Sequence, residues 1–95
     1  MKSVVIKAST KPDKKLMAVF TRDGRKKTIH FGAKNMDDYT KTGDKAQRKR
    51  YLDRHRKNER WNSPETAGAL SRWILWGATT SRRENIQRFK KRFGY

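Results

Sequence analysis

A dense group of positively charged side chains is the feature of this sequence best suited to binding chemistry. Eight of the sixteen residues from 45 to 60 are Lys or Arg, and only Asp53 and Glu59 oppose them. Arginine dominates the group, and its planar guanidinium can donate two parallel hydrogen bonds to a phosphate or a carboxylate. We expect this segment to dock on an anion. The alternative is a solvated helical face that only keeps the protein soluble.

The candidate anion-binding residues come from two segments that we expect to be helical. They are Arg48, Lys49, Arg50, Arg54, Arg56, Lys57, Arg60, Arg82, Arg83, Arg88 and Arg92. None of these side chains is placed in a pattern typical of base recognition. Binding to duplex DNA would therefore depend on shape and charge rather than on base sequence.

The sequence shows no convincing arrangement for catalysis, for a cofactor or for a metal. Ser71 and His55 are present, but nothing in the sequence places a nucleophile beside its base. The chain has no cysteine, and two histidines alone cannot build a zinc site. Asp37, Asp38 and Asp44 lie close together, but their spacing does not fit the calcium-binding helix-loop-helix template, so we expect a solvated loop there. We predict a protein that is not an enzyme and has no cofactor.

Composition indicates one small, soluble and strongly basic domain. The 95 residues include 26 Lys and Arg against 9 Asp and Glu, which gives a formal net charge of +17. Such a charge attracts polyanions in a salt-sensitive way. Four Phe, three Trp and three Tyr nevertheless argue for a packed core. No apolar run approaches the roughly 20 residues that span a bilayer, and no signal peptide is visible.

The first third of the chain has the pattern of an antiparallel sheet. Apolar runs typical of strands occupy residues 3–8, 16–20 and 28–31. Asp23-Gly24 is a hairpin signal, because glycine adopts the positive φ that tight hairpin turns require. Alternation places five apolar side chains on one face: Leu16, Ala18, Phe20, Ile29 and Phe31. We expect a three-stranded meander over 1–32, followed by an irregular polar loop over 33–44.

Residues 45–95 are expected to hold three helices. The first begins after Asp44, which forms a capping pair with Gln47, and it runs to about Asn58 with His55 packed beside Tyr51. The last begins after Ser81, in a capping box with Glu84, and it ends at Gly94.

The middle helix, over 63–77, is the most apolar run of the chain and the expected centre of the core. Ser63 suits the N-cap, Pro64 suits the first helical position, and Gly77 suits a left-handed end. We expect four of its side chains to be buried between the sheet and the flanking helices: Leu70, Trp73, Ile74 and Trp76. The predicted fold is a single α+β domain over 1–95, a three-stranded antiparallel β-meander followed by three short α-helices.

A series of short motifs carries a resemblance that covers roughly residues 28 to 93. They are His30-Phe31-Gly32, Lys49-Arg50-Tyr51, Arg54-His55, Asn58-Glu59, Trp61-Asn62, Pro64, Thr66-Ala67-Gly68, Leu70-Ser71-Arg72 and Ile74-Leu75-Trp76. In this combination the chain resembles small basic proteins encoded by large DNA viruses of algae and amoebae. The resemblance implies no catalytic activity and therefore no active-site residues.

What the resemblance implies is a virion protein, made in the cytoplasm or nucleus of the host cell before assembly. Particles of such viruses have a double-jelly-roll outer shell, an inner membrane and many minor capsid proteins that tie the shell together. We expect a minor capsid component that docks its arginine-rich surface on acidic faces of neighbouring major and minor capsid proteins. The alternative is a sequence-nonspecific nucleic-acid-binding protein that packages the viral genome.

Two further classes of partner are not favoured. Contact with a membrane surface would need aromatic side chains that are free to insert, whereas those of this chain are needed for the core. No small-molecule substrate is expected, because the glycines follow neither the dinucleotide nor the P-loop spacing.

Overall fold

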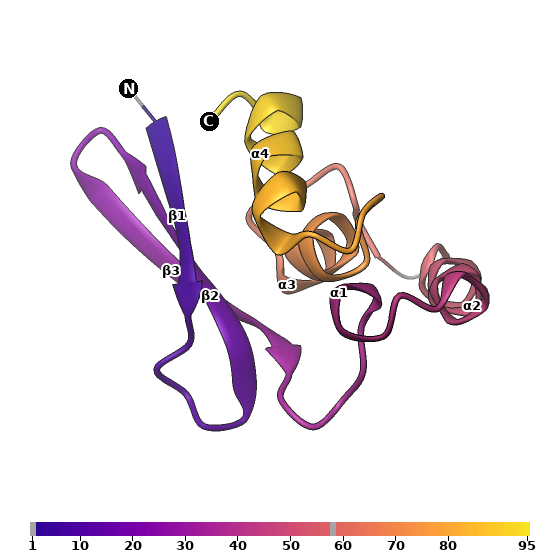
Figure 1. The fold of residues 1–95 in the computed structure, drawn as a ribbon. Helices are drawn as coiled ribbons and strands as arrows, with labels where there is room; N and C mark the ends of the chain where they lie inside the picture. Colours follow the sequence, from indigo (N-terminus) through magenta and orange to yellow (C-terminus); the bar gives the residue numbers. More distant parts are fainter. Residues whose placement is uncertain (1, 58) are drawn as a thin grey trace.

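The protein is built from a sheet and a group of short helices that covers one face of it (Figure 1). The computed structural model describes residues 2–57 and 59–95. The strands are β1 (Lys2–Ala8), β2 (Lys14–Arg22) and β3 (Arg25–Ala33). The helices are α1 (Tyr39–Thr42), α2 (Lys45–His55), α3 (Ala67–Leu70), the π-helix η1 (Ser71–Leu75) and α4 (Arg82–Phe93). The predicted α+β fold, with a three-stranded antiparallel sheet ahead of several short helices, is confirmed.

The sheet is an antiparallel meander in the order β1-β2-β3. Leu16 pairs with Phe31 and Ala18 pairs with Ile29, which is the shared face expected from alternation. At the β2–β3 turn both Asp23 and Gly24 have positive φ, 51° and 79°, as a tight two-residue hairpin requires. This turn lets the strand pairing run to the hairpin tip, so β2 and β3 are longer than the apolar runs alone indicated.

The apolar run predicted as one helix over 63–77 begins later and ends in a π-helix. Its N-cap is Thr66, whose side-chain oxygen accepts a hydrogen bond from Ala69 N at 3.2 Å. The prediction that Ser63 caps the helix and Pro64 starts it is therefore wrong, because the first helical residue is Ala67. Thr66 donates to the carbonyl of Ser63 at 2.9 Å, and this contact closes a turn ahead of the helix.

The expectation that Gly77 forms a left-handed helix end is wrong. A glycine is needed at this position because there is no room for a side chain. The glycines with positive φ do not include Gly77, and the helix ends at Leu75 with Trp76 as its C-cap. A Cβ atom on Gly77 would lie 2.4 Å from the carbonyl oxygen of Trp73 and 2.7 Å from Cγ of Asn85. The close approach of α4 to η1 therefore excludes a side chain at this position.

Buried Asn85 holds α4 against the end of η1. Its amide nitrogen donates to the carbonyls of Ile74 and Thr79, both at 2.8 Å. Its Oδ1 accepts from the hydroxyl of Thr79 at 2.8 Å and from Thr79 N at 3.2 Å. Both donors and both acceptor sites of the amide are thus satisfied without water, although the side chain is fully buried.

Two of the predicted helix starts are confirmed, but with different reciprocal contacts. Asp44 caps α2, and Ser81 caps α4 by accepting from Glu84 N at 3.2 Å. Gln47 does not return to Asp44; it accepts from Thr42 Oγ1 at 2.8 Å. Glu84 likewise pairs with an arginine on its own helix, so the second half of each predicted capping pair is not formed. The predicted end of α4 at Gly94 is confirmed, and Gly94 is left-handed there, with φ 73°.

The core joins the sheet to η1 and α4. Its fully buried large apolar side chains are Phe31, Leu70, Ile74, Leu75 and Phe89. Trp76 is buried as predicted and stacks on Tyr51, with 4.2 Å between ring centroids and planes only 5° apart. Trp73 is only half-buried, because it packs at the edge of the core, where its Nε1 donates to the carbonyl of Trp61 at 2.7 Å.

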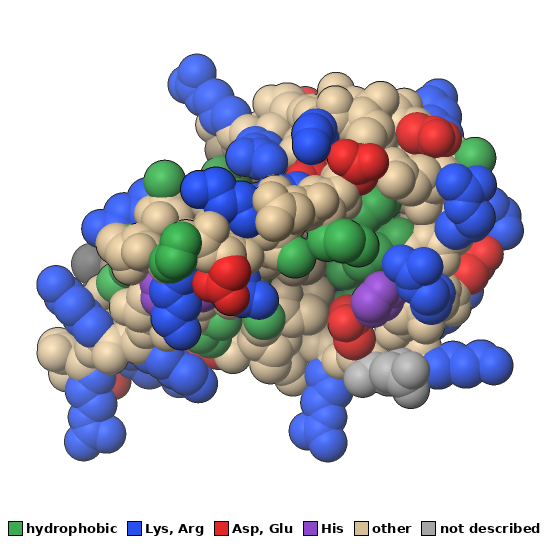
Figure 2. Space-filling view, turned by 90° about the horizontal axis from the view of Figure 1, so that it is seen from below, with side chains coloured by type: hydrophobic (Ala, Val, Ile, Leu, Met, Phe, Trp, Pro, Cys, Tyr) green, Lys and Arg blue, Asp and Glu red, His purple; other side chains and the backbone are tan. Residues whose placement is uncertain are grey.

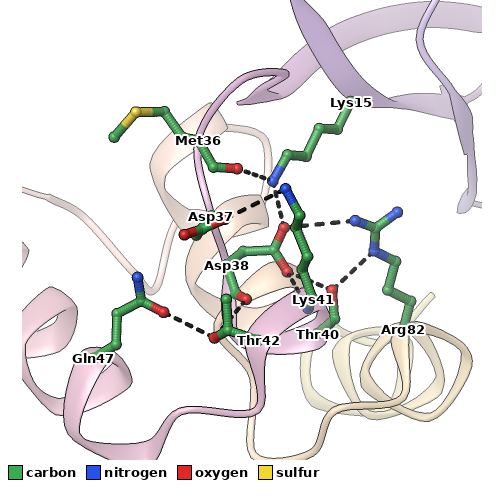
Figure 3. Close-up of polar contacts among 9 residues, drawn as sticks. All are labelled: Lys15, Met36, Asp37, Asp38, Thr40, Lys41, Thr42, Gln47 and Arg82. Atoms are coloured by element: carbon green, nitrogen blue, oxygen red, sulfur yellow. Dashed lines mark hydrogen bonds and ion pairs between the residues drawn. The ribbon is translucent and has the colours of Figure 1, made fainter.

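A buried carboxylate, Asp38, ties the sheet to α1 and α4 (Figure 3). Its Oδ2 lies 2.5 Å from Nζ of Lys15 in β2 and 3.5 Å from Nη2 of Arg82 in α4. Its Oδ1 accepts from the hydroxyl of Thr40 and from Lys41 N. The side chain is 1% exposed, so the expectation of a solvated loop is wrong at this residue.

The segment 33–44 is also less irregular than predicted. It contains α1, one helical turn that Asp38 caps and that ends at Gly43 with φ 64°. Asp37 pairs with Lys41 at 3.3 Å, and Asp44 caps α2, so the three carboxylates have separate partners. No group of three His, Cys, Asp or Glu within residues 2–57 and 59–95 could hold a metal ion. No helix in the same ranges is long and apolar enough to cross a membrane.

The surroundings of Asp38 make the stability of the fold depend on pH. Burial alone would raise the pKa of Asp38, but hydrogen bonds from Lys15 and Thr40 and the charges of Lys15 and Arg82 hold it below its ordinary value of 3.8. A carboxylate with a lowered folded-state pKa stabilises the fold above its unfolded pKa. That stabilisation is lost as the pH falls through the folded value.

We expect Asp38→Asn to lower the free energy of unfolding at pH 7 by about 3 kcal/mol, because it leaves the half-buried ammonium of Lys15 without its carboxylate. Asp37→Asn is the matched control; it removes an exposed carboxylate and should change stability by less than about 1 kcal/mol. Denaturant titrations at pH 7 and pH 3 measure both effects. The wild-type protein should lose more stability than Asp38→Asn between these pH values, and equal losses in both would contradict this role.

Candidate anion-docking surface

Helix α2 presents most of its cations to solvent. In Figure 1 it lies at the edge of the helical group farthest from the sheet. Six of the predicted residues are exposed here: Lys49, Arg50, Arg54, Arg56, Lys57 and Arg60. Lys49 pairs with Asp53 at 3.0 Å. Within the described ranges, the other five side chains make no hydrogen bond or ion pair, so they are available to a partner.

The last three of these cations lie beyond α2 and not on it. The helix was predicted to run to about Asn58, a residue that lies outside the described ones. It ends at His55, and Arg56 is its C-cap. Arg56, Lys57 and Arg60 therefore extend the exposed basic surface into the connection between α2 and α3.

Arg48, in contrast, is used within the fold. Its Nε donates to the carbonyls of Trp76 at 3.2 Å and Gly77 at 2.9 Å, at the end of η1 where backbone acceptors have no helical partner. Its guanidinium carbon lies 5.6 Å from the ring centroid of Tyr39. The prediction that Arg48 belongs to the outer docking face is thus corrected: it links α2 to η1.

The predicted arginines of α4 also differ in their surroundings. Arg82 points inward, because its Nε donates to Thr40 Oγ1 at 2.9 Å and its Nη2 faces the buried carboxylate described above. Arg88 pairs with Glu84 at 3.1 Å. Arg83 is exposed and has no hydrogen-bond or ion-pair partner within residues 2–57 and 59–95. Of these three predicted residues, only Arg83 is fully available to a partner.

Sequence reasoning did not select Arg72, the second residue of η1. Its Nη1 donates to the carbonyl of Trp76 at 3.3 Å, and its guanidinium carbon lies 5.1 Å from the ring centroid of Trp61. Its Nε is buried and has no hydrogen-bond partner among the residues that the structure describes. An arginine inside the most apolar run of the chain was the one sequence signal that could have pointed to it.

The indole of Trp73 brings two arginines together. The guanidinium carbons of Arg72 and Arg92 lie 4.2 Å and 4.0 Å from its ring centroid, so they are no farther apart than the sum of these distances. Two charges about 8 Å apart repel by about 2 kcal/mol at an effective dielectric constant of about 20. Each contact with the ring contributes about 0.5–1 kcal/mol. Since water also screens the exposed Arg92, the ring can hold both cations without a carboxylate between them.

A small pocket opens among these side chains, where α2, η1 and α4 meet. Its volume is about 160 Å³, and we call it the arginine pocket. Its lining residues are Arg48, Arg72, Trp73, Ala78, Arg88, Phe89 and Arg92. The walls thus combine four guanidinium groups with apolar surface, and no acidic side chain is among these lining residues.

Electrostatics in the arginine pocket disfavour positive charge. Burial, followed by the charges of Arg48 and Arg92, lowers the pKa of Arg72 to about 10. Arg72 still carries its proton at neutral pH, but its charged form is less favourable there than in water. An anion in the pocket would raise the pKa of Arg72 again, because an opposite charge stabilises the protonated guanidinium.

A second cavity, of about 310 Å³, brings Ser71, His55 and Glu59 to one place. His55 Nδ1 lies 3.0 Å from Glu59 Oε1, and the imidazole stacks on Tyr51 at 4.3 Å between centroids, as predicted. Among the described residues no hydrogen bond joins Ser71 to His55. The contact that would activate a serine nucleophile is therefore not formed. Trp61 Nε1 donates to the same Glu59, so the group also stabilises the turn after α2.

We expect Arg48→Gln to lower the free energy of unfolding by about 1–2 kcal/mol, because it removes charged hydrogen bonds to two carbonyls at the end of η1. Arg50→Gln makes the same change of charge two residues along α2, at an exposed position, and should change stability by less than about 0.5 kcal/mol. Chemical denaturation of the two variants measures the difference. Equal losses would show that Arg48 does not link α2 to η1.

Comparison with known proteins places the chain in a family but gives it no activity. The family described as "Family of unknown function (DUF5754)" matches residues 4–55, which is more than half of the chain. The match runs from within β1 to the end of α2, so it includes most of the sheet, Asp38 with its partner Lys15, and the whole of α2, but not Arg82. No curated protein and no solved structure matches the chain. The chain therefore belongs to this family of unknown function.

Proposed function

We propose that the chain is a non-enzymatic structural protein that docks its basic helical surface on acidic faces of partner proteins. The viral resemblance gives the setting: a minor capsid component of a large DNA virus particle, in contact with neighbouring capsid proteins. The observation that supports this proposal is the exposed face of α2 and the connection after it. There Arg50, Arg54 and Arg56 have no acidic partner among the described residues.

Most of the nine acidic side chains are already engaged within the fold, and nine carboxylates cannot neutralise 26 cations. Asp53 and Glu84 pair with cations of their own helices, and Asp38 is buried with two cations around it. Figure 2 shows Lys and Arg side chains projecting from all sides of the face seen from below, with fewer Asp and Glu between them. The net charge of +17 must therefore be compensated from outside the chain.

An acidic protein fits the surface better than a nucleic acid does. All ten aromatic side chains are described, and none of them is exposed. Proteins that bind single strands stack bases on accessible aromatic rings, and those that read a duplex place side chains at base edges. The guanidinium groups of Arg72 and Arg92 already occupy the indole of Trp73. A nucleic acid would thus be held by charge alone. Packaging of the viral genome, which needs only such binding, is the alternative function.

The energetics of ion pairs determine what each function predicts. An exposed ion pair contributes about 0–1 kcal/mol, so docking on a protein needs several pairs made together at fixed positions. Neutralising two neighbouring arginines should then remove most of the affinity. Binding to nucleic acid averages over many phosphates, so each lost cation weakens it slightly and lowers the salt dependence by about one unit.

We expect the double variant Arg50→Gln and Arg54→Gln to reduce incorporation into virus particles at least tenfold. The two side chains are one helical turn apart on the exposed face of α2. The matched control, Lys7→Gln and Lys26→Gln, removes the same charge from exposed positions on the sheet and should incorporate normally. Incorporation is measured by quantifying the chain in purified particles.

Gentle dissociation of the same particles separates the two functions. The proposal predicts that the chain leaves with shell fragments. Recovery with the DNA core at moderate salt, together with equal losses in the two double variants, would contradict docking on capsid proteins and support genome packaging.

A further inference from the structure

We propose that the arginine pocket is the anchor site for one acidic side chain, a glutamate or an aspartate, of the docked partner protein. This inference rests on the proposed function, because it names the contact that would make docking specific. The pocket shares Arg48 with α2 and lies on the side of that helix that faces η1. Arg56, the exposed C-cap of α2, is near enough for its charge to act on Arg72, so one partner surface can reach Arg56 and the pocket together.

The charge of the pocket fits an anion. Four arginines line it, and within residues 2–57 and 59–95 only Arg88 has a carboxylate partner, Glu84, which is not one of the lining residues. Arg72 supplies a buried Nε with no hydrogen-bond partner among the described residues. Buried donors are normally paired, so an unpaired one beside a pocket calls for an acceptor from outside the chain. A carboxylate can accept two parallel hydrogen bonds from one guanidinium.

The apolar part of the pocket favours a side chain over a phosphate group. Trp73, Ala78 and Phe89 contribute apolar surface between the guanidinium groups. A glutamate side chain has methylene groups that can pack on such surface and a carboxylate that can reach the cations. A phosphate needs hydrogen-bond donors on all of its oxygens and gains nothing from the aromatic walls.

The size of the pocket also favours a single side chain as its occupant. Its volume of about 160 Å³ is below the roughly 300 Å³ at which pockets for drug-sized ligands begin. It therefore suits one side chain and not a nucleotide. Arginines in water-excluding pockets are typical centres of binding energy in protein interfaces, surrounded by contacts of little individual value. The arginine pocket would be such a centre in the docked interface.

Small carboxylates test the anchor directly on the whole chain. Sodium acetate, sodium butyrate and inorganic phosphate are titrated at constant ionic strength, and binding is followed by NMR at the indole N–H of Trp73 and at Nε–H of Arg72 and Arg92. Butyrate has two more methylenes than acetate, and each buried methylene is worth about fourfold in affinity. We expect a saturable response in which butyrate binds about tenfold more tightly than acetate and more tightly than phosphate.

Variants assign the response to the pocket. Arg92→Gln should weaken butyrate binding at least fivefold without unfolding the chain, because Arg92 is exposed and makes no hydrogen bond within residues 2–57 and 59–95. Arg72→Gln should abolish binding, but this residue is half-buried, so its fold is first checked by the dispersion of the NMR spectrum. Lys7→Gln, on the sheet, is the control of equal charge and should bind butyrate as the wild-type protein does.

Three results would overturn the anchor: no saturable response at these groups, tightest binding of phosphate, or equal weakening by Arg92→Gln and Lys7→Gln. The anchor can fail while the proposed function holds. In that case the pocket does not bind butyrate, but Arg50→Gln with Arg54→Gln still prevents incorporation. If butyrate binds as expected and that double variant incorporates normally, the pocket stands and docking through α2 is wrong.

Discussion

A shortage of carboxylates determines how this molecule holds its arginines. Nine acidic side chains face 26 cations, and the acids that lie inside the fold are engaged by residues such as Lys15 and Arg82. Three further arginines are held by groups other than carboxylates. Arg48 donates to carbonyls at the end of η1, and Arg72 and Arg92 lie against the indole of Trp73. These contacts hold the guanidinium groups in place and offset part of the cost of removing them from water. They do not neutralise the positive charges of these arginines.

The uncancelled charge links the fold to its proposed function. The indole of Trp73, which holds Arg72 and Arg92, is itself packed against the core. These two guanidinium groups are thus presented on a rigid support and lose little freedom when they bind. A preorganised cationic surface gains more from a partner with fixed carboxylates than a flexible basic tail would.

The sequence predicted the parts of the fold that depend on local signals. Asp23-Gly24 placed the hairpin, Ser81 placed the start of α4, and alternation placed Phe31 on the core face. The parts that depend on contacts between distant residues could not be predicted. Asp38 is buried because Lys15 and Arg82 converge on it from two other elements. The polar sequence around Asp38 does not indicate that these two cations lie near it.

The candidate site was predicted only in outline, for the same reason. The exposed cations of α2 follow from charge and helical spacing, whereas the inward turn of Arg48 depends on where η1 ends. The arginine pocket joins Arg48, Arg72 and Arg92, which are far apart in the sequence and which meet only when α2, η1 and α4 pack together. Its central member, Arg72, sits in a segment whose composition indicates core.

The most direct test is carbodiimide crosslinking of intact particles, which joins a lysine amine only to a carboxylate in contact with it. Docking through α2 and the connection after it predicts crosslinks from Lys49 and Lys57 to aspartate or glutamate residues of other particle proteins. Lys7 and Lys26 on the sheet serve as the comparison, because they are exposed as well. Crosslinks from the sheet lysines alone, or none from the helical lysines to any protein, would contradict it.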